Sequence, residues 1–217
     1  MFGAMTNLKS LDLSNFDTSK VTSIYGMFIN DYALSDLNVS SFDTSKVTNM
    51  ASTFQNIKVE NLDLTNLDTS NVVTMEQMFS GFRGNTLNVS SFDTSKVTNM
   101  RAMFYGCYSL TELDVTNFDT SKVTNMGYMF YNCNKLTNLD VSNFNTSNVT
   151  NMTSMFYNCQ NLTNLDLSSF DFTNVTNSSN MFFNVPASSL IYVKDDTSKE
   201  FILAAKSDLT NVQIKEA

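Results

Sequence analysis

The sequence predicts a β-rich α/β solenoid, in which short units of the chain stack along one axis and share one apolar core. Three columns of apolar residues, one each of phenylalanine, leucine and valine, recur in step every 25 or 26 residues. A fixed period of this length indicates a solenoid, because each unit can bury its apolar face only against its neighbours. The phenylalanine column consists of Phe2, Phe28, Phe54, Phe79, Phe104, Phe130, Phe156 and Phe182.

The unit at residues 110–133 shows the elements that we expect in every coil. Leu113, Val115 and Phe118 alternate with polar residues, which predicts a short strand with one buried and one exposed face. Residues 119–121 follow as a turn, because Asp and Ser side chains bond backbone amides two residues further on. Residues 122–126 are expected to form a second short strand. Stacked units would then form two short parallel β-sheets.

The end of the same unit has the spacing of a short helix. Its apolar residues stand at i, i+3, i+4 and i+7, namely Met126, Met129, Phe130 and Cys133. This spacing is typical of one or two turns of α- or 3₁₀-helix. Each coil is therefore expected to add one short helical turn, and these turns are expected to stack into a column beside the two sheets.

The chain divides into a repetitive part and a terminal segment. Residues 1–183 are expected to form the solenoid, with about seven units, and residues 184–217 to cap the open end of its core. Within that segment we expect a strand at 189–193, a short helix at 196–206 and a last strand at 212–214. Because the chain opens in the middle of a unit, we also expect it to be part of a longer protein.

The composition argues against two classes of partner. The formal net charge is −8 and the pI is near 4.4, so a phosphate backbone or an anionic lipid surface would be repelled over most of the protein. The apolar runs are far shorter than the ~20 residues needed to cross a bilayer. We therefore expect no binding to nucleic acid and no membrane insertion of this segment.

The chain lacks the residues on which many enzymatic mechanisms depend. It has no histidine, so neither a Ser-His-Asp nor a Cys-His arrangement is available. Its six glycines form no phosphate-binding motif. Its carboxylates recur in columns, whereas a pair of catalytic acids requires two different environments. We expect no enzymatic activity, no catalytic residue and no cofactor.

Two columns could in principle hold a metal ion, but a structural role is favoured for each. The turn aspartates, such as Asp119, would bring oxygens close together for calcium. Aspartate is nevertheless ordinary in a turn, and a lysine such as Lys122 follows three residues later. Cys107, Cys133 and Cys159 share one column, and no histidine completes a zinc site. We expect ordinary turns, three buried thiols and no metal.

A column of asparagine follows the second expected strand. Its members are Asn49, Asn99, Asn125, Asn151 and Asn177. A side-chain amide that points inward could bond the backbone of the next coil and satisfy groups that no regular ladder reaches. The alternative is an exposed polar stripe, because Ser23 and Thr74 occupy the same column.

Two surfaces are candidates for binding a partner, and the first is acidic. The exposed face of the first strand is wide and built of small polar and acidic side chains, and solenoids commonly bind partners on such a face. The candidate residues are Glu112, Asp114, Asp140 and Asp166. The alternative is that these residues only keep the sheet soluble.

The second candidate surface is aromatic. Tyr105, Tyr131 and Tyr157 share one column, and Tyr108 and Tyr128 lie nearby in the sequence. Tyrosine combines a large contact area with a hydroxyl group, which suits the recognition of protein or sugar. The alternative is a structural ladder in which each ring packs on its neighbours. The confinement of the tyrosines to the later units keeps the binding hypothesis open.

The repeated pattern MFxxCxxLTxLDVSNFDTSKVTNM closely resembles the BspA-like leucine-rich repeat surface proteins of bacteria. The resemblance covers essentially the entire chain, and the ending IYVKDDTSKEFILAAK is similar to the cap that these proteins often carry. The chain departs from the pattern at residues 54–86, where the cysteine is lost and two units have 25 residues. We therefore expect a right-handed solenoid of the leucine-rich-repeat type, with the two sheets, the helical turns and the cap described above.

The resemblance also implies a function. The family is largely secreted, lipid-anchored or wall-anchored, and its understood members act in adhesion. We expect an extracellular, cell-surface binding module, anchored through other parts of a longer protein, whose partner is a protein or glycan on a host or neighbouring cell. The second hypothesis is a structural spacer without a ligand, which predicts uniform columns throughout. A metal-dependent enzyme is a third, but no unique polar constellation supports it.

Overall fold

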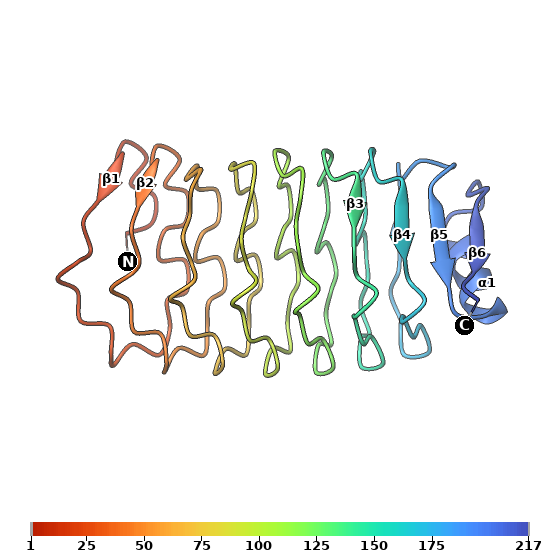
Figure 1. Cartoon of the computed structure of the whole chain (residues 1–217), viewed down its shortest axis with the longest axis horizontal. Coiled ribbons are helices and arrows are strands. Elements are labelled where there is room, and N and C mark those ends of the chain that lie inside the picture. The colour runs from red at the N-terminus through yellow and green to blue at the C-terminus, as the bar shows by residue number, and fades with distance from the viewer. Residues whose placement is uncertain (1, 217) are drawn as a thin grey trace.

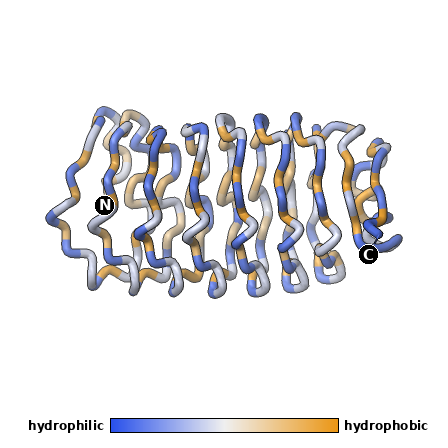
Figure 2. Tube along the Cα trace, viewed as in Figure 1, coloured by the Kyte–Doolittle hydropathy of each residue, from blue (hydrophilic) through white to orange (hydrophobic). Residues whose placement is uncertain are grey.

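The computed structural model describes residues 2–216, whose backbone is mostly irregular, with turns and bends between short strands. Successive coils of the chain lie side by side along the long axis of the molecule, from the N-terminus to the C-terminus (Figure 1). Apolar residues recur at corresponding places in successive coils (Figure 2). This arrangement is consistent with the predicted solenoid.

The first expected strand forms parallel sheets only towards the two ends of the molecule. β1 (Ser10–Leu11) pairs with β2 (Asp36–Leu37) in one sheet. The second sheet contains β3 (Asn138–Leu139), β4 (Asn164–Asp166), β5 (Leu190–Val193) and β6 (Val212–Ile214). Among the described residues, none between 38 and 137 belongs to a strand. The sheet expected along this side is therefore interrupted in the middle coils.

The second expected strand of each coil contributes one residue to a continuous parallel ladder. Each member of the asparagine column forms a bridge to its counterpart in the next coil, without a break from Ser23 to Asn177. The neighbouring backbone also bonds across coils; for example, Thr150 N donates to Thr124 O at 2.9 Å. The predicted second sheet is thus reduced to a bridge of one residue per coil.

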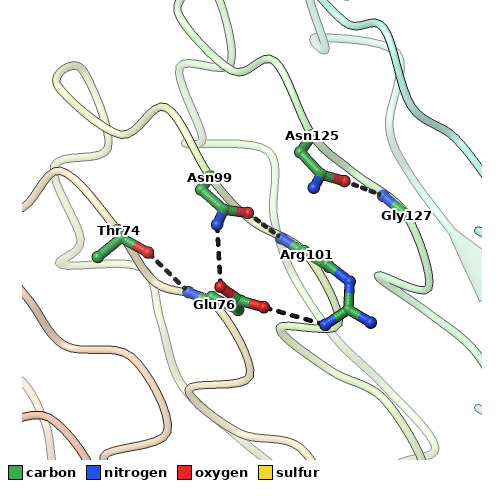
Figure 3. A network of polar contacts seen from close by, with 6 residues as sticks. All are labelled: Thr74, Glu76, Asn99, Arg101, Asn125 and Gly127. Atoms are coloured by element: carbon green, nitrogen blue, oxygen red, sulfur yellow. Dashed lines mark hydrogen bonds and ion pairs between the residues drawn. The ribbon is translucent and has the colours of Figure 1, made fainter.

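The asparagine side chains bond the backbone of their own coil, which corrects the inward-pointing interpretation. Asn125 Oδ1 accepts from Gly127 N at 3.0 Å, and Asn99 Oδ1 accepts from Arg101 N at 3.0 Å (Figure 3). The bridge already pairs the backbone of adjacent coils, so the amide instead closes a local turn of the kind that asparagine favours. The position is half-buried from Asn49 to Asn151, so it is not an exposed stripe either.

The stretch expected to be helical, residues 126–133, forms consecutive tight turns instead. Met129 N donates to Met126 O at 3.2 Å, which closes the first turn. Tyr128 and Asn132 adopt the left-handed backbone conformation, with φ of 62° and 59°. A right-handed helix cannot pass through such residues. The predicted column of helical turns is therefore wrong.

Other amide groups in this stretch bond across coils. Phe104 N donates to Met129 O at 3.0 Å, and Phe130 N donates to Met155 O at 2.9 Å. A helix would direct these N–H groups along its own axis to the residue four positions earlier. Because the next coil offers acceptors instead, the chain forms a column of stacked turns.

A ladder of phenylalanine rings runs through the interior, and we call it the inner ladder. From Phe28 to Phe182 consecutive rings are stacked, with centroids 5.7–5.9 Å apart, and all of them are buried. Cys107, Cys133 and Cys159 are buried free thiols, and each Sγ lies 3.2 Å from a phenylalanine carbonyl oxygen. The predicted core column and the predicted buried thiols are confirmed.

The last segment contains the expected strand, helix and strand at the C-terminal end of the stacked coils (Figure 1). The helix, α1 (Asp196–Ala205), lies between β5 and β6 in the chain. Asp195 caps it, because its side chain accepts from Ser198 N at 2.7 Å. Ile202 joins the hydrophobic core. Within residues 2–216, α1 is the only helix.

Candidate functional site

A second ladder of aromatic rings lies half-buried at the surface of the stacked turns, and we call it the outer ladder. Tyr105, Tyr131, Tyr157 and Phe183 stack in this order, with centroids 4.6, 4.5 and 4.6 Å apart. Phe183 is 46 % exposed. Sequence reasoning missed Phe183, although its position 26 residues after Tyr157 places it in the same column.

The outer ladder ends at Tyr105. The two preceding units carry Ser80 and Gln55 at the equivalent position, and among the described residues Tyr105 has a stacked ring only on the side of Tyr131. A groove of about 510 Å³ opens at this end of the ladder. Its lining includes Gln55, Ser80, Tyr105, Tyr108 and Tyr128. The fold thus brings three of the predicted tyrosines together around one hollow.

The other two predicted tyrosines have a different place. Tyr131 and Tyr157 each have a stacked ring on both sides, and neither lines the groove. Burial raises the pKa of Tyr131, and its neighbours Tyr105 and Tyr157 raise it further. These rings therefore support Tyr105 from behind, and the ladder interpretation holds for them.

An arginine and a glutamate hold Tyr128 in position. The Arg101 guanidinium lies over the Tyr128 ring, 5.3 Å from its centroid, an arrangement favoured by the ring's electron-rich face. Arg101 Nη1 donates to Glu76 Oε1 at 3.0 Å, and Asn99 Nδ2 donates to Glu76 Oε2 at 3.1 Å (Figure 3). Both carboxylate oxygens are occupied. Sequence reasoning missed Glu76 and Arg101, which are brought together only by the stacking of their coils.

The groove presents phenol hydroxyl groups at its surface. Tyr108 is 53 % exposed, and Asn132 Nδ2 donates to its hydroxyl oxygen at 3.4 Å. Burial raises the pKa of Tyr105, and the nearby phenols of Tyr108 and Tyr128 raise it further. Because the ordinary value is already 10.0, the Tyr105 hydroxyl stays protonated at neutral pH and can donate a hydrogen bond.

Three of the predicted acidic residues line a separate hollow. Glu112, Asp114 and Asp140 are exposed and lie around a depression of about 460 Å³ that shares no residue with the tyrosine groove. Asp114 Oδ1 accepts from Thr116 N at 3.0 Å and from Thr116 Oγ1 at 2.6 Å. These hydrogen bonds lower the Asp114 pKa. Asp140 accepts in the same way from Ser142, so the two aspartates are engaged in local turns.

Asp166 does not belong to this hollow. Its Oδ2 forms an ion pair with Lys215 Nζ at 2.5 Å, and the residue is half-buried. Burial acts to raise the pKa of Asp166, but the hydrogen bonds from Lys215 and Ser168 outweigh it and lower the pKa. The residue therefore links β4 to the end of the chain.

The turn aspartates have the structural role predicted for them. Asp119 Oδ1 accepts from Ser121 N at 2.9 Å, and side-chain and backbone hydrogen bonds with Ser121 lower the Asp119 pKa. Within residues 2–216, no group of three or more His, Cys, Asp or Glu side chains is placed to hold a metal ion. The arrangement on the tyrosine side offers contact area and hydrogen bonds, which suit binding.

Comparison with protein families gives one assignment. A model of the family described as "Mycoplasma protein of unknown function, DUF285" matches residues 1–86 and 81–191, which is most of the chain. The chain belongs to this family. The DUF285 description carries no activity, and neither a curated protein nor a solved structure matches the chain. Among the described residues, no helix has the length and hydrophobicity to span a membrane.

Proposed function

We propose that this DUF285 chain is a binding module whose tyrosine groove contacts a partner on a host or neighbouring cell. The observation that supports this function is the end of the outer ladder at Tyr105, where three tyrosines surround a groove of about 510 Å³. The inner ladder continues from Phe28 to Phe182 without such a break. A spacer without a ligand predicts uniform columns on both the inside and the outside.

The residue types in the groove favour binding. Tyrosine and arginine are enriched among the residues that dominate binding energies. Tyrosine offers a large contact area with few freely rotating bonds, and arginine offers a rigid set of hydrogen-bond donors. The volume of the groove falls within the range of about 300–1,000 Å³ typical of ligand sites. The stacked rings behind Tyr105 restrict its motion, which reduces the entropy lost on binding.

The proposal also covers the type of solenoid, the C-terminal cap, the cellular location and the class of partner. We propose a right-handed solenoid of the leucine-rich-repeat type over residues 1–183, with residues 184–217 as its C-terminal cap. The BspA-like resemblance supports an extracellular, cell-surface location and a protein or glycan as partner. The net charge of −8 disfavours nucleic acid as a partner. The proposal includes no enzymatic activity and no cofactor.

A binding screen with two matched variants tests this function. The wild-type chain is tested against immobilised matrix proteins, a glycan array and whole cells. The outer-ladder variant carries Tyr105→Ser, Tyr131→Ser and Tyr157→Ser. The acidic-hollow variant carries Glu112→Gln, Asp114→Asn and Asp140→Asn, which keep the size and hydrogen-bonding atoms of the side chains. Far-UV circular dichroism verifies that both variants are folded.

We expect the outer-ladder variant to lose binding and the acidic-hollow variant to keep it. Equal binding by the wild type and the outer-ladder variant would remove the tyrosine proposal. Loss of binding in the acidic-hollow variant alone would move the site to the strand face. A wild type that binds nothing in the screen would favour the spacer.

A further inference from the structure

On the surface of the turns, the outer ladder ends at Tyr105, and a second ladder is interrupted in the same part of the chain. Besides the outer ladder of rings, a ladder of side-chain amides occupies the adjacent column of the repeat. Asn56 Nδ2 donates to Asn30 Oδ1, and Asn158 Nδ2 donates to Asn132 Oδ1, both at 2.7 Å. The two units between Asn56 and Asn132 carry glycine at this position. The amide ladder therefore has a gap of two coils, and Tyr105 stands in the same part of the chain.

The glycines remove side chains without changing the path of the backbone. Gly81 and Gly106 have φ of 68° and 66°, close to the 61° of Asn56 and the 59° of Asn132. Glycine adopts this left-handed conformation without steric cost, so the coils stay in register. A neighbouring side chain takes the place of the missing one, Asn56 at Gly81 and Tyr108 at Gly106. Both glycines line the tyrosine groove.

An amide oxygen without a donor lies at the edge of this gap. A Cβ placed on Gly81 would stand 1.9 Å from Asn56 Oδ1, so the Asn56 carbonyl oxygen lies directly over the glycine. Asn56 donates to Asn30 through Nδ2, and none of the hydrogen bonds formed among residues 2–216 has Asn56 Oδ1 as its acceptor. The groove thus presents an unpaired acceptor and, at Tyr105, an aromatic face without a stacked ring.

We propose that the groove binds a neutral pyranose ring of a glycan, which stacks on the open face of Tyr105. The sugar would take the next position of the outer ladder, where the chain has Ser80 and no aromatic ring. This inference rests on the binding function proposed above and names the class of partner. A pyranose presents C–H groups on its face and hydroxyl groups around its edge. The face would contact Tyr105, and an edge hydroxyl would donate to Asn56 Oδ1.

The lining of the groove favours a sugar over an aromatic side chain of a peptide. Besides the tyrosines, the groove is lined by the amides of Gln55, Asn56 and Gln77 and by Ser80. A phenyl ring bound on Tyr105 would cover these polar groups without pairing them, which costs free energy. A sugar pairs with them through its hydroxyl groups. A peptide with aromatic residues is therefore the competing outcome of the test.

The charges around the groove favour a neutral sugar. Within residues 2–216, Arg101 is the only charged residue that lines the groove, and its guanidinium is already paired with Glu76 at 3.0 Å. No unpaired cation is thus offered to a carboxylate or sulfate group. The net charge of the chain, −8, also repels acidic glycans at long range.

The test uses defined probes and two variants of the whole chain. Saturation-transfer NMR is measured with hexamers of α-1,4-linked glucose, β-1,4-linked glucose and β-1,4-linked N-acetylglucosamine, and a glycan array covers branched and acidic sugars. Ser80→Tyr places a ring where the sugar is proposed to stack, and Tyr105→Ala removes the stacking face. Tyr157→Phe is the control, because it keeps the stack and lies outside the groove.

We expect at least one neutral glycan to bind the wild type and the Tyr157→Phe variant equally. Both Ser80→Tyr and Tyr105→Ala are expected to weaken that binding at least about tenfold, as the blocking or loss of an anchoring ring does. Because Ser80 is only 4 % exposed, far-UV circular dichroism and urea denaturation verify that Ser80→Tyr is folded, so that its loss of binding is not explained by unfolding. Tyrosine-rich and phenylalanine-rich peptides are expected not to compete.

Other results overturn the inference in distinguishable ways. Glycan binding that survives both groove variants places the sugar elsewhere. Competition by aromatic peptides identifies a peptide site in the same groove. Binding to proteins or cells without any glycan binding overturns the sugar and leaves the proposed binding function intact. An absence of binding to every probe, protein and cell overturns both.

Discussion

The inner and outer ladders follow the same period but differ in extent and environment. The inner ladder continues from Phe28 to Phe182 and is buried throughout. The outer ladder covers only the coils from Tyr105 to Phe183, and its rings are partly exposed. Each interior ring is needed to fill the core of its own coil, whereas a surface position can change without opening a cavity. Differences in side chains between coils can therefore indicate function at surface positions, whereas the buried positions are constrained by packing.

The backbone also differs between two sides of the coils. The bridges of the asparagine column are unbroken from Ser23 to Asn177, whereas strands on the other side are missing between residues 38 and 137. Leu62, Leu87 and Leu113 remain buried in those coils. The apolar side chains thus keep the coils in register where the strand hydrogen bonds are absent.

The largest effect is expected from breaking the inner ladder. Phe130→Ala removes a ring that is stacked between Phe104 and Phe156 and leaves a cavity in a closed core. We expect the free energy of unfolding to fall by about 3–5 kcal/mol, measured by urea denaturation. A loss below about 1 kcal/mol would show that the coils collapse around the missing ring and that the ladder does not determine stability.

A buried polar column should be the next most sensitive. Thr120 is 1 % exposed, and its hydroxyl donates to Asn145 O in the next coil at 2.9 Å. Thr120→Val keeps the shape but leaves that carbonyl without its donor, so unfolding should become easier by about 1–3 kcal/mol. The control is Thr116→Val, whose hydroxyl bonds an exposed carboxylate. An equal loss in the free energy of unfolding for Thr120→Val and Thr116→Val would contradict the view that burial makes the Thr120 hydrogen bond more important for stability.

The outer ladder should contribute less to stability than the inner ladder. Tyr131→Ala removes two stacking contacts, at 4.6 and 4.5 Å, from a half-buried site. A stacked pair is worth about 0.5–1.5 kcal/mol, and we expect a loss of that order in the same urea experiment. Tyr131→Phe keeps the stack and should change stability by less than about 0.5 kcal/mol. A loss as large as that of Phe130→Ala would erase the distinction between the ladders.

The smallest effect concerns pH. Hydrogen bonds from the turn lower the pKa of Asp93 and Asp119 below the ordinary value of 3.8. These two carboxylates therefore hold protons less tightly in the folded state than in the unfolded state. They stabilise the folded state at pH values above 3.8, and this stabilisation is lost as the pH falls through their lower folded pKa values. Asp119→Asn should reduce the loss of thermal stability in acid. Asn145 already occupies this column and accepts from Ser147 N at 3.1 Å.

An acid transition that is unchanged in Asp119→Asn, and in the double variant with Asp93→Asn, would assign the pH dependence to other carboxylates. Asp31 is the natural control, because burial raises its pKa. A carboxyl group whose pKa is raised by folding destabilises the folded state as the pH rises, so its effect on stability has the opposite pH dependence to that of the turn aspartates.

The sequence predicted the interior of this protein better than its surface. The apolar columns, the buried cysteines and the Asp–Ser turns follow from the period and from elementary side-chain chemistry, because each coil repeats the same solution. The strand, helix and strand near the C-terminus were also predicted, since Asp195 provides a helix cap and residues 190–193 are apolar. The helical turns at 126–133 were wrong because the apolar spacing of a helix also fits two tight turns.

A signal for those tight turns was present in the sequence. Glycine or asparagine occupies the Asn132 position in the coils from Asn30 to Asn184, and both residue types tolerate positive φ. The groove was harder to predict, because Gln55, Ser80 and Tyr105 lie successively one unit apart in the sequence and meet only when the coils stack. Aligning them in one column would have shown a small residue before a run of rings.

The separation of fold and function between the two ladders is tested most directly by measuring unfolding and binding on one protein, the variant with Tyr105, Tyr131 and Tyr157 changed to serine. We expect this variant to unfold cooperatively in urea, with a stability loss smaller than that of Phe130→Ala, and no longer to bind the partner found in the screen. Retained binding, or a loss of structure as severe as that caused by breaking the inner ladder, would contradict the separation of fold and function between the two ladders.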